Sequence, residues 1–437
     1  MRLILWMLCA VPLAAQPLPL SLRRAVELAV APGGATAVKL SAEGLKQAEA
    51  RSAQSRAALL PDISAAFSDE NLTRNLAAMG LRISVPIPGF QIPVFVGPFS
   101  AMDARVSASQ SVFDFSSLRR FQASKVGVSA AKAEVDGSAE QVAAQVARAY
   151  LGAERADADV EAAKANVTLS EAVWRQAERQ KSAGTGTGIE ITRARVQLAN
   201  DRQRLLVAEN ARHAAGLQLL RAIGLGLDTE LALTDRLQYV PVDAVTMEQA
   251  KARALGERPD LAAQREREAG ARLAASATKL ERLPTVAAFG DYGSSGTGFG
   301  NSLPTRTIGI QVRVPLFDGG RRDARRVESA SQYRAEKVKT NDLRQQIELD
   351  VRLALDELGS AEEQVKVARE GLELAENELA QARRRYEAGV AIGVEVTDAQ
   401  SRLERARDNQ TAALYNHNVG RLDLAQAMGA VRQGLRP

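Results

Sequence analysis

The sequence predicts a mainly α-helical fold with a small β part, and three observations lead to this prediction. All 15 prolines fall outside two long windows, 99–240 and 316–436. Because proline breaks helix interiors, these windows can hold long helices. The chain also repeats itself with an offset of about 205 residues. Stretches in which apolar and polar residues alternate precede each long window, which is typical of β-strands.

The composition is that of a folded protein and excludes one class of partner. Of the 437 residues, 46% are hydrophobic and 25% are charged, whereas aromatic residues make up only 4%. The 57 basic and 52 acidic residues give a net charge of +5, and the two signs alternate along predicted helical faces. Because base-stacking aromatic residues are scarce as well, we expect no nucleic-acid partner.

The sequence contains one cysteine, Cys9, and two histidines, His213 and His417, so few side chains are available for catalysis or metal binding. They exclude a disulfide framework, a Cys/His zinc site and an iron–sulfur cluster. Both histidines lie on predicted helices with no nucleophile motif nearby. The sequence therefore predicts a protein that is not an enzyme, with no catalytic residue, no metal and no cofactor.

Residues 1–15 are predicted to be a secretory signal peptide. Arg2 supplies the positive charge, the apolar stretch 3–11 follows, and small residues end at Ala15, where we expect cleavage. A short buried helix is the alternative interpretation. No other stretch of about 18 apolar residues occurs, which predicts an exported protein without a transmembrane helix.

The remaining chain divides into two repeats. The first is expected over 16–225 and the second over 246–430, with an inter-repeat linker at 226–245 and a C-terminal tail at 431–437. Each repeat has the order short helix, two strands, long helix, glycine-rich turn and short helix. Six residues recur 205 positions later: Gly184, Gly188, Glu190, Thr192, Leu198 and Gly224, as Gly389, Gly393, Glu395, Thr397, Leu403 and Gly429.

Long helices are predicted at 116–181 and 321–386, and each would span roughly 100 Å at about 1.5 Å per residue. Shorter helices are predicted at 21–59, 188–223, 246–282 and 392–428. Apolar residues at heptad spacing on 321–386 form a coiled-coil seam. The seam consists of Ile347, Val351, Ala354, Leu358, Ala361, Val365, Ala368, Leu372, Ala375, Leu379, Ala382 and Tyr386.

Further apolar residues lie off this seam, namely Leu353, Val367 and Leu374. They indicate contact with more than one neighbouring helix, which suits a closed ring of antiparallel coiled coils. A cytosolic coiled coil is the alternative before the strands are considered.

The predicted strands discriminate between these alternatives. Their alternating apolar positions are Ile63, Ala65 and Phe67; Val106, Ala108 and Val112; Val286, Ala288 and Tyr292; and Ile308, Ile310, Val312, Val314 and Leu316. Such alternation fits outer-membrane barrel strands, although half-buried hairpins of a soluble domain show it too. Because four strands cannot close a barrel and a membrane tolerates no open edge, an oligomer must supply the rest. Surface loops are predicted at 71–103 and 293–304.

The sequence resembles the TolC-like outer-membrane efflux family over nearly all of the predicted mature chain. The stretch Val-Pro-Leu-Phe-Asp-Gly-Gly-Arg at 314–321 resembles the family's junction between strand and long helix. Arg-Arg-Arg-Tyr-Glu-Ala-Gly at 383–389, followed by Glu-Val-Thr-Asp at 395–398, resembles its helix-turn-helix at the periplasmic tip. Arg-Pro-Asp-Leu at 258–261 resembles the start of the family's second repeat.

The resemblance implies a homotrimer in which each chain gives four strands to a transmembrane β-barrel and its helices to a long periplasmic coiled-coil barrel. It implies a passive channel-tunnel in the outer membrane, part of a tripartite efflux or type I secretion system. The expected partners are outer-membrane lipid, a periplasmic adaptor protein and an inner-membrane pump. A non-conducting periplasmic coiled-coil scaffold is the alternative function.

The resemblance further implies a gate at the periplasmic tip. Glu395 and Asp398 match acids that ring the closed entrance, and because they lie three residues apart they share one helix face. An ordinary solvated helix N-terminus is the alternative for these acids. Tyr386 matches the family's gate tyrosine, whereas Ala391 stands where the family's best-studied pattern has an arginine.

The two repeats differ at this gate. Glu190 matches Glu395, but Arg193 stands where the second repeat has Asp398, and Lys181 stands where it has Tyr386. We hypothesise that Arg193 or Lys181 pairs across the tip with one of the two acids. The tip turns, with glycines that permit a positive φ, are the expected adaptor contacts. Those glycines are Gly184, Gly188, Gly389 and Gly393.

Overall fold

The computed structural model describes residues 18–80, 94–243 and 245–434. The predicted signal peptide at 1–15 and the middle of the predicted loop 71–103 lie outside these residues. The described chain forms two compact units, the first from residues up to 44, 131–263 and 340 onward, and the second from 45–130 and 264–339. Each unit therefore takes segments from both sequence repeats.

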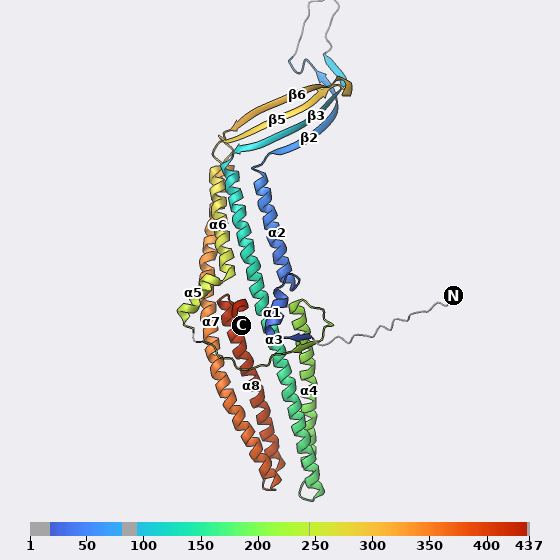
Figure 1. Cartoon of the computed structure of the whole chain (residues 1–437), viewed down its shortest axis with the longest axis vertical. Coiled ribbons are helices and arrows are strands. Elements are labelled where there is room, and N and C mark those ends of the chain that lie inside the picture. The colour runs from blue at the N-terminus through green and yellow to red at the C-terminus, as the bar shows by residue number, and fades with distance from the viewer. Residues whose placement is uncertain (1–17, 81–93, 244, 435–437) are drawn as a thin grey trace, which may run out of the picture. The chain divides into compact units, whose positions relative to one another are not determined.

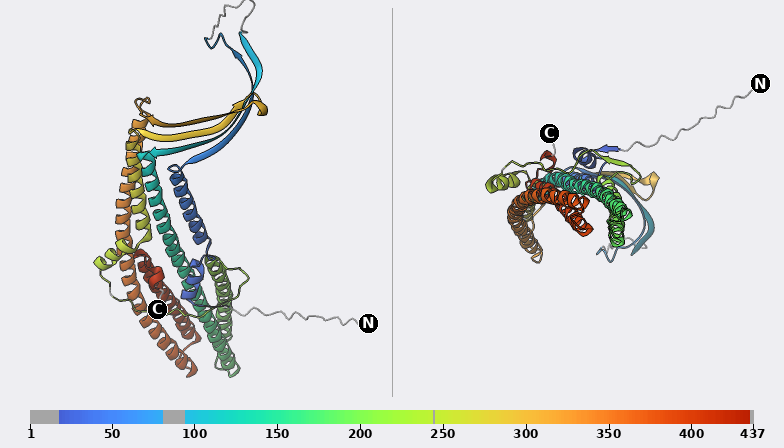
Figure 2. Two further views of the ribbon diagram at one scale, coloured as in Figure 1. Left: turned by 45° about the horizontal axis from the view of Figure 1, so that its top comes forward. Right: turned by 90° about the horizontal axis from the view of Figure 1, so that it is seen from below.

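The first unit is built around two helical hairpins. Its long helices are residues 131–182 of α3 (Phe115–Ser182) and residues 340–387 of α7 (Arg321–Glu387). In Figures 1 and 2, α4 (Gly188–Ile223) runs beside α3, and α8 (Gly393–Ala427) runs beside α7. The predicted ends of both long helices, 116–181 and 321–386, are confirmed to within one residue.

The predicted seam packs inside the first unit. Ile347 and Val351 are fully buried, and Ala382 and Tyr386 lie in a second cluster near the far end of α7. The off-seam residues Leu353, Val367 and Leu374 are instead 56%, 68% and 62% exposed. The helix α7 therefore has one buried apolar stripe and one that is left exposed by the described part of the chain.

Two of the predicted short helices are each interrupted and form two separate helices. The range 21–59 contains α1 (Leu22–Val30) and α2 (Thr36–Ala57), and they separate at Gly34, where a Cβ would lie 2.3 Å from the carbonyl oxygen of Leu28. The range 246–282 contains α5 (Met247–Glu257) and α6 (Pro259–Leu280). Arg258 has an extended ψ of 118° because proline follows it.

A short parallel strand pair that the sequence did not predict completes the first unit. β1 (Leu18–Leu20) pairs with β4 (Leu231–Leu233), inside the predicted inter-repeat linker. Leu20 is fully buried in a cluster with Tyr150 of α3. A last short helix, α9 (Val431–Gly434), follows α8.

The second unit holds an antiparallel four-stranded sheet in the order β2-β3-β5-β6, visible in Figure 1. Its strands are β2 (Asp62–Asn75), β3 (Phe95–Phe113), β5 (Thr285–Gly296) and β6 (Leu303–Arg313), with a 3-10 turn, η1 (Phe299–Asn301), before β6. All four strands extend into the predicted loops, and β6 ends before Val314. Strand pairing therefore extends the hairpins beyond the segments in which apolar and polar residues alternate in the sequence.

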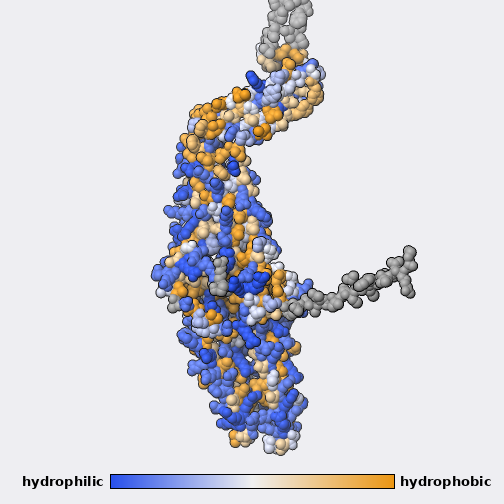
Figure 3. Space-filling view, viewed as in Figure 1, coloured by the Kyte–Doolittle hydropathy of each residue, from blue (hydrophilic) through white to orange (hydrophobic). Residues whose placement is uncertain are grey.

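The predicted alternation is confirmed on the sheet. Ile63 pairs with Ala108, Val106 pairs with Tyr292, and Val286 pairs with Val312, so the apolar residues of four strands share one face. On that face Ile308 is 83% exposed and Ile310 74%. Figure 3 shows hydrophobic colour over the strands, whereas the helices are mostly hydrophilic. This sheet thus presents an apolar face that the described residues leave exposed.

Candidate functional site

The predicted tip residues come together where the two hairpins of the first unit turn. At the first turn Gly184 has a φ of +79°, and its N–H donates to the carbonyl oxygen of Lys181. At the second turn Gly389 has a φ of +73° and donates in the same way to Tyr386. Gly188 and Gly393 are instead the first residues of α4 and α8, with no positive φ. Only two of the four glycines are therefore required by backbone conformation.

Glu190 joins the two hairpins. One carboxylate oxygen accepts from the backbone N–H of Thr187 at 2.8 Å and from its hydroxyl at 3.1 Å, which caps α4. The other oxygen accepts from the backbone N–H of Gly393 at 3.4 Å, at the start of α8. The Thr187 amide, the Thr187 hydroxyl, Gly393 and Arg193 together hold the pKa of Glu190 below its usual 4.5. Glu190 is therefore an ionised acceptor shared by both helix N-termini.

Tyr386 fills the space beneath this link. Its side chain is only 4% exposed and packs with Ala177 of α3 and Val396 of α8. Its carbonyl oxygen accepts a hydrogen bond from Nε2 of Gln180, at 3.3 Å. Burial and the nearby charge of Glu190 raise the pKa of the phenol. The predicted gate tyrosine is thus a packing residue between the hairpins.

The two predicted gate acids are placed differently. Glu395 forms an ion pair with Arg385 of its own hairpin, with Nε and Oε1 3.2 Å apart, and Asp398 is exposed on the next turn of α8. Arg193 and Lys181 are also exposed, and within the described part of one chain neither forms an ion pair with these acids. The hypothesised pairing across the tip is therefore absent inside the single chain.

Sequence reasoning missed Gln180 and Arg385. They occupy equivalent positions of the two repeats, 205 residues apart, and each reaches out of the last turn of its long helix. The repeat offset was the signal that could have found them.

A buried polar network lies further along the same helices. Ser170 of α3, Asp201 of α4 and Gln400 of α8 are each 1% exposed. Ser170 donates to Asp201, and Nε2 of Gln400 donates to Ser170 at 3.0 Å. Glu404, 5% exposed, accepts from Arg204. Burial and the neighbouring Asp201 raise the pKa of Glu404.

A second buried carboxyl lies beside the short strand pair. Glu154 of α3 is 7% exposed, and burial, Asp235 and Asp157 raise its pKa to about 7. Asp235 accepts from the N–H of Leu22 at 2.8 Å and from the hydroxyl of Tyr150 at 3.2 Å. The Tyr150 hydroxyl thus anchors the strand pair to α3, through Asp235 and the carbonyl oxygen of Leu20.

The residues of these sites link helices to one another. Among residues 18–80, 94–243 and 245–434, no group of three or more His, Cys, Asp or Glu side chains could hold a metal ion. No helix in the same residues is both long and apolar enough to span a bilayer.

Comparison with known proteins gives a family match along most of the chain. The family model described as "Outer membrane efflux protein" matches residues 36–225 and 252–430. The alkaline protease secretion protein AprF of Pseudomonas aeruginosa is 24% identical over 320 residues, covering 71% of this chain and 66% of AprF, just under two thirds of its length. The pyoverdine export outer membrane protein OpmQ of Pseudomonas putida is 25% identical over 354 residues, covering 77% of this chain and 72% of OpmQ.

Solved structures share the fold. The CmeC outer membrane channel of Campylobacter jejuni superposes with a TM-score of 0.81 at 16% identity, covering 94% of this chain and 85% of that one. The outer membrane protein VceC of Vibrio cholerae gives a TM-score of 0.78 at 19% identity, covering 94% and 96%. The mainly helical architecture with a small sheet is therefore the fold of these proteins.

Proposed function

The chain belongs to the outer membrane efflux protein family, and on this premise we propose that it is the outer-membrane exit duct of a tripartite efflux or type I secretion system. The family and the fold are those of channel proteins, not of enzymes. The duct conducts substrates passively from a periplasmic adaptor and an inner-membrane pump to the exterior, and the pump supplies the energy.

The observation that carries this proposal is the sheet of the second unit. β2 and β6 lie at its two edges, and in the described part of the chain neither pairs with a further strand. In hydrocarbon, unpaired backbone N–H and C=O groups cost several kcal/mol each. A homotrimer in which β6 of one copy pairs with β2 of the next would close the barrel and satisfy both edges.

The uncovered stripe on α7 supports the same assembly. Leu353, Val367 and Leu374 are all more than half exposed, and Val196 and Leu206 of α4 are 55% and 63% exposed. Exposed apolar stripes at heptad-compatible spacing indicate a helical partner. In a closed ring, each hairpin would meet a hairpin of the neighbouring copy along these stripes.

The repeat also predicts how neighbouring copies meet at the tip. The offset of 205 residues relates Glu190 to Glu395, and Gly393 to Gly188. Within one chain the N–H of Gly393 donates to Glu190. In a threefold assembly, the N–H of Gly188 of the next copy would donate to Glu395. This contact would match the hydrogen bond from Gly393 to Glu190 within one chain. Glu395 and Asp398 would then form an acidic ring that favours cations.

The exposed turns at Gly184 and Gly389 are the proposed contacts for the adaptor. The relatives AprF and OpmQ are named for protease secretion and pyoverdine export. By analogy, the cargo of this duct is a secreted polypeptide or a small molecule, and the pump selects it.

Dye release from proteoliposomes tests this proposal. Purified protein is reconstituted into vesicles loaded with a small fluorescent dye, beside the variant Glu190→Ala, which lacks the link between the hairpins. We expect release by the wild type and faster release by the variant. If neither protein releases dye, although both are trimeric and membrane-inserted, the chain is a non-conducting scaffold instead.

A further inference from the structure

We propose that the junction between the strands and the long helices binds the headgroups of anionic phospholipids. This inference rests on the outer-membrane location of the proposed function. The junction consists of three segments of the second unit, 113–122, 278–283 and 316–326, which we call the junction belt. They contain the starts of α3 and α7 and the end of α6.

Most of the chain's excess positive charge lies in the junction belt. The belt holds eight basic and four acidic side chains: Arg119, Arg120, Lys279, Arg282, Arg321, Arg322, Arg325 and Arg326 against Asp114, Glu281, Asp318 and Asp323. The net charge of the whole chain is only +5. Outside the belt, therefore, positive and negative charges nearly cancel.

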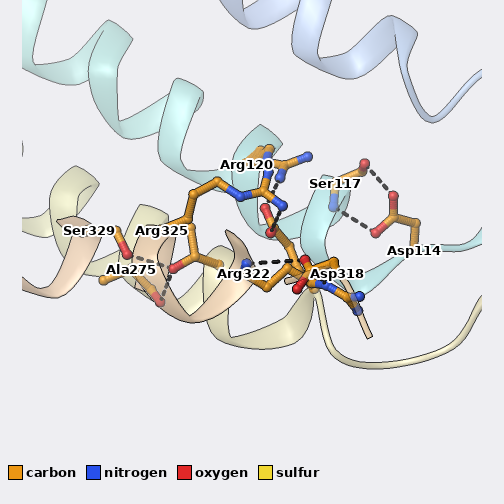
Figure 4. Close-up of polar contacts among 10 residues, drawn as sticks. Asp114, Ser117, Arg120, Ala275, Asp318, Arg322, Arg325 and Ser329 are labelled. Carbon is orange, nitrogen blue, oxygen red and sulfur yellow. Dashed lines mark hydrogen bonds and ion pairs between the residues drawn. The ribbon is translucent and has the colours of Figure 1, made fainter. Parts of the chain in front are cut away.

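The acids of the belt are already engaged (Figure 4). Glu281 accepts from Arg120 of α3, and its Oε2 lies 2.9 Å from a guanidinium nitrogen of Arg325 of α7. Asp318 accepts from Nε of Arg322 at 2.7 Å and from its N–H at 3.1 Å, which anchors the start of α7. These contacts tie three helix ends together. They also use the carboxylates that could otherwise neutralise further arginines.

The remaining two acids are also occupied. Asp114 accepts from the N–H of Ser117 at 3.0 Å, at the start of α3. Asp323 pairs with Arg282 at the end of α6. All four acids of the junction belt therefore already cap a helix or hold helix ends together.

Two exposed arginines of the junction belt are not held by a carboxylate. Arg119 donates to the neutral Gln122, at 2.8 Å. The charge of Arg321 helps to lower the pKa of Asp318, but the hydrogen bonds to that carboxylate come from Arg322. Neither arginine forms an ion pair with an acid among the described residues. A free guanidinium presents several N–H donors in a planar fork that matches a phosphate group.

Large exposed apolar side chains lie close to these two arginines in the sequence. Leu316 and Phe317, directly before the start of α7, are 92% and 89% exposed, and Phe113, Phe115 and Leu118 are 42–56% exposed. They continue the apolar face of the sheet toward the helices. Girdles of aromatic residues flank the apolar band of membrane barrels, and long basic side chains at this boundary extend their charged ends toward the headgroups. Apolar side chains would contact the acyl chains, and the guanidinium groups the phosphates.

The occupant is a phospholipid rather than soluble phosphate, because an inorganic ion would leave Leu316 and Phe317 in water. It is anionic because the belt has an excess of four positive charges and two arginines free to pair. The leaflet concerned is the one nearer the helices. Basic residues at an anionic membrane surface typically gain about fivefold in affinity for each charge.

Native mass spectrometry of the detergent-purified protein tests this inference. Protein is equilibrated with equal amounts of phosphatidylglycerol and phosphatidylethanolamine, and the retained lipid is counted. We expect wild-type protein to prefer phosphatidylglycerol by about tenfold or more, and Arg119→Gln/Arg321→Gln to lose most of this preference. The matched control is Arg344→Gln/Arg369→Gln, which removes the same charge from exposed arginines of α7 in the first unit.

Retained preference in the junction variant, or equal loss in the control, would overturn the proposal. Displacement of the lipid by millimolar inorganic phosphate would also overturn it, because the site would then be a phosphate site. Circular dichroism checks folding, and the single variant Arg321→Gln, expected to lose about fivefold, provides a second measurement. Dye release in neutral phosphatidylcholine vesicles reads the channel separately, so failure of the proposed function would be recognised independently of lipid preference.

Discussion

The backbone N–H of Gly393 donates a hydrogen bond to the carboxylate of Glu190, 203 residues earlier in the chain, with N and Oε1 3.4 Å apart. This contact joins the N-terminus of α8 to that of α4, directly at the turns of both hairpins. A carboxylate is favoured there because each helix N-terminus carries partial positive charge. The link between the hairpins is therefore electrostatic as well as apolar, and it can be broken by one substitution.

Removal of Glu190 should loosen the tip. Glu190→Ala deletes the cap of α4 and the bond to Gly393, which together contribute about 1–2 kcal/mol. We expect amide hydrogen exchange at the start of α8 to become about tenfold faster. Glu178→Ala is the matched control, because Glu178 of α3 forms its ion pair with Arg195 of the same hairpin. Equal exchange rates in the two variants would contradict the link.

The same link should fail in acid. The pKa of Glu190 is lowered in the folded chain, so its stabilisation is fully present above the usual value of 4.5 and is lost as the pH falls through the lowered pKa. Hydrogen exchange at Gly393 should accelerate below about pH 4.5 in the wild type, relative to Glu190→Ala. A constant ratio of the two rates between pH 6 and pH 3 would show that Glu190 does not contribute.

Glu154 should make the folded chain less stable as the pH rises toward neutral. Its pKa is raised to about 7, so the folded chain favours the uncharged acid, and stability decreases as the pH rises from about 4.5 to about 7 and is then constant. Glu154→Gln should remove this decrease, on the order of 3 kcal/mol. Thermal unfolding at pH 5 and pH 8 measures it. The control is Glu161→Gln, an exposed acid of α3 that pairs with Lys164; the same response there would refute the assignment.

Two glycines that follow helices should resist substitution. Gly224 and Gly429 have φ values of +89° and +73°, and a Cβ on either would lie 2.9 Å from a backbone atom, of Gly34 and Arg258 respectively. Replacement by alanine should cost about 1–3 kcal/mol at each position. Gly216→Ala, inside α4 with no atom within 4 Å of the added Cβ, should instead stabilise by about 0.5–1 kcal/mol. Thermal unfolding distinguishes these signs, and uniform effects would contradict the account.

The sequence predicted the long helices well because their signals are local. The absence of proline and the heptad seam define α3 and α7 to within one residue. The break at Arg258 could have been predicted from Pro259, which disfavours a helical residue before it, but the range 246–282 was expected to be a single helix. The three-residue strands β1 and β4 have no local pattern, since each residue pairs with one 213 positions away in the sequence.

The candidate site was predicted in part. The turn glycines, Tyr386 and Glu190 came from the repeat and from the family resemblance. The network of Ser170, Asp201 and Gln400 could not be predicted, because three polar residues on three helices meet only through packing. Within the chain Glu395 pairs with Arg385. Arg385 therefore competes for this carboxylate with Arg193 and Lys181, the partners expected from charge alone.

Planar-bilayer conductance tests the central claim most directly. Purified protein is compared with Glu395→Ala/Asp398→Ala, which removes the proposed acidic ring while leaving Glu190 and its link to Gly393 intact. We predict small, cation-selective currents for the wild type, and larger or less selective currents for the variant. Absence of any current, from protein shown to be folded and trimeric, would contradict the channel and leave a periplasmic scaffold.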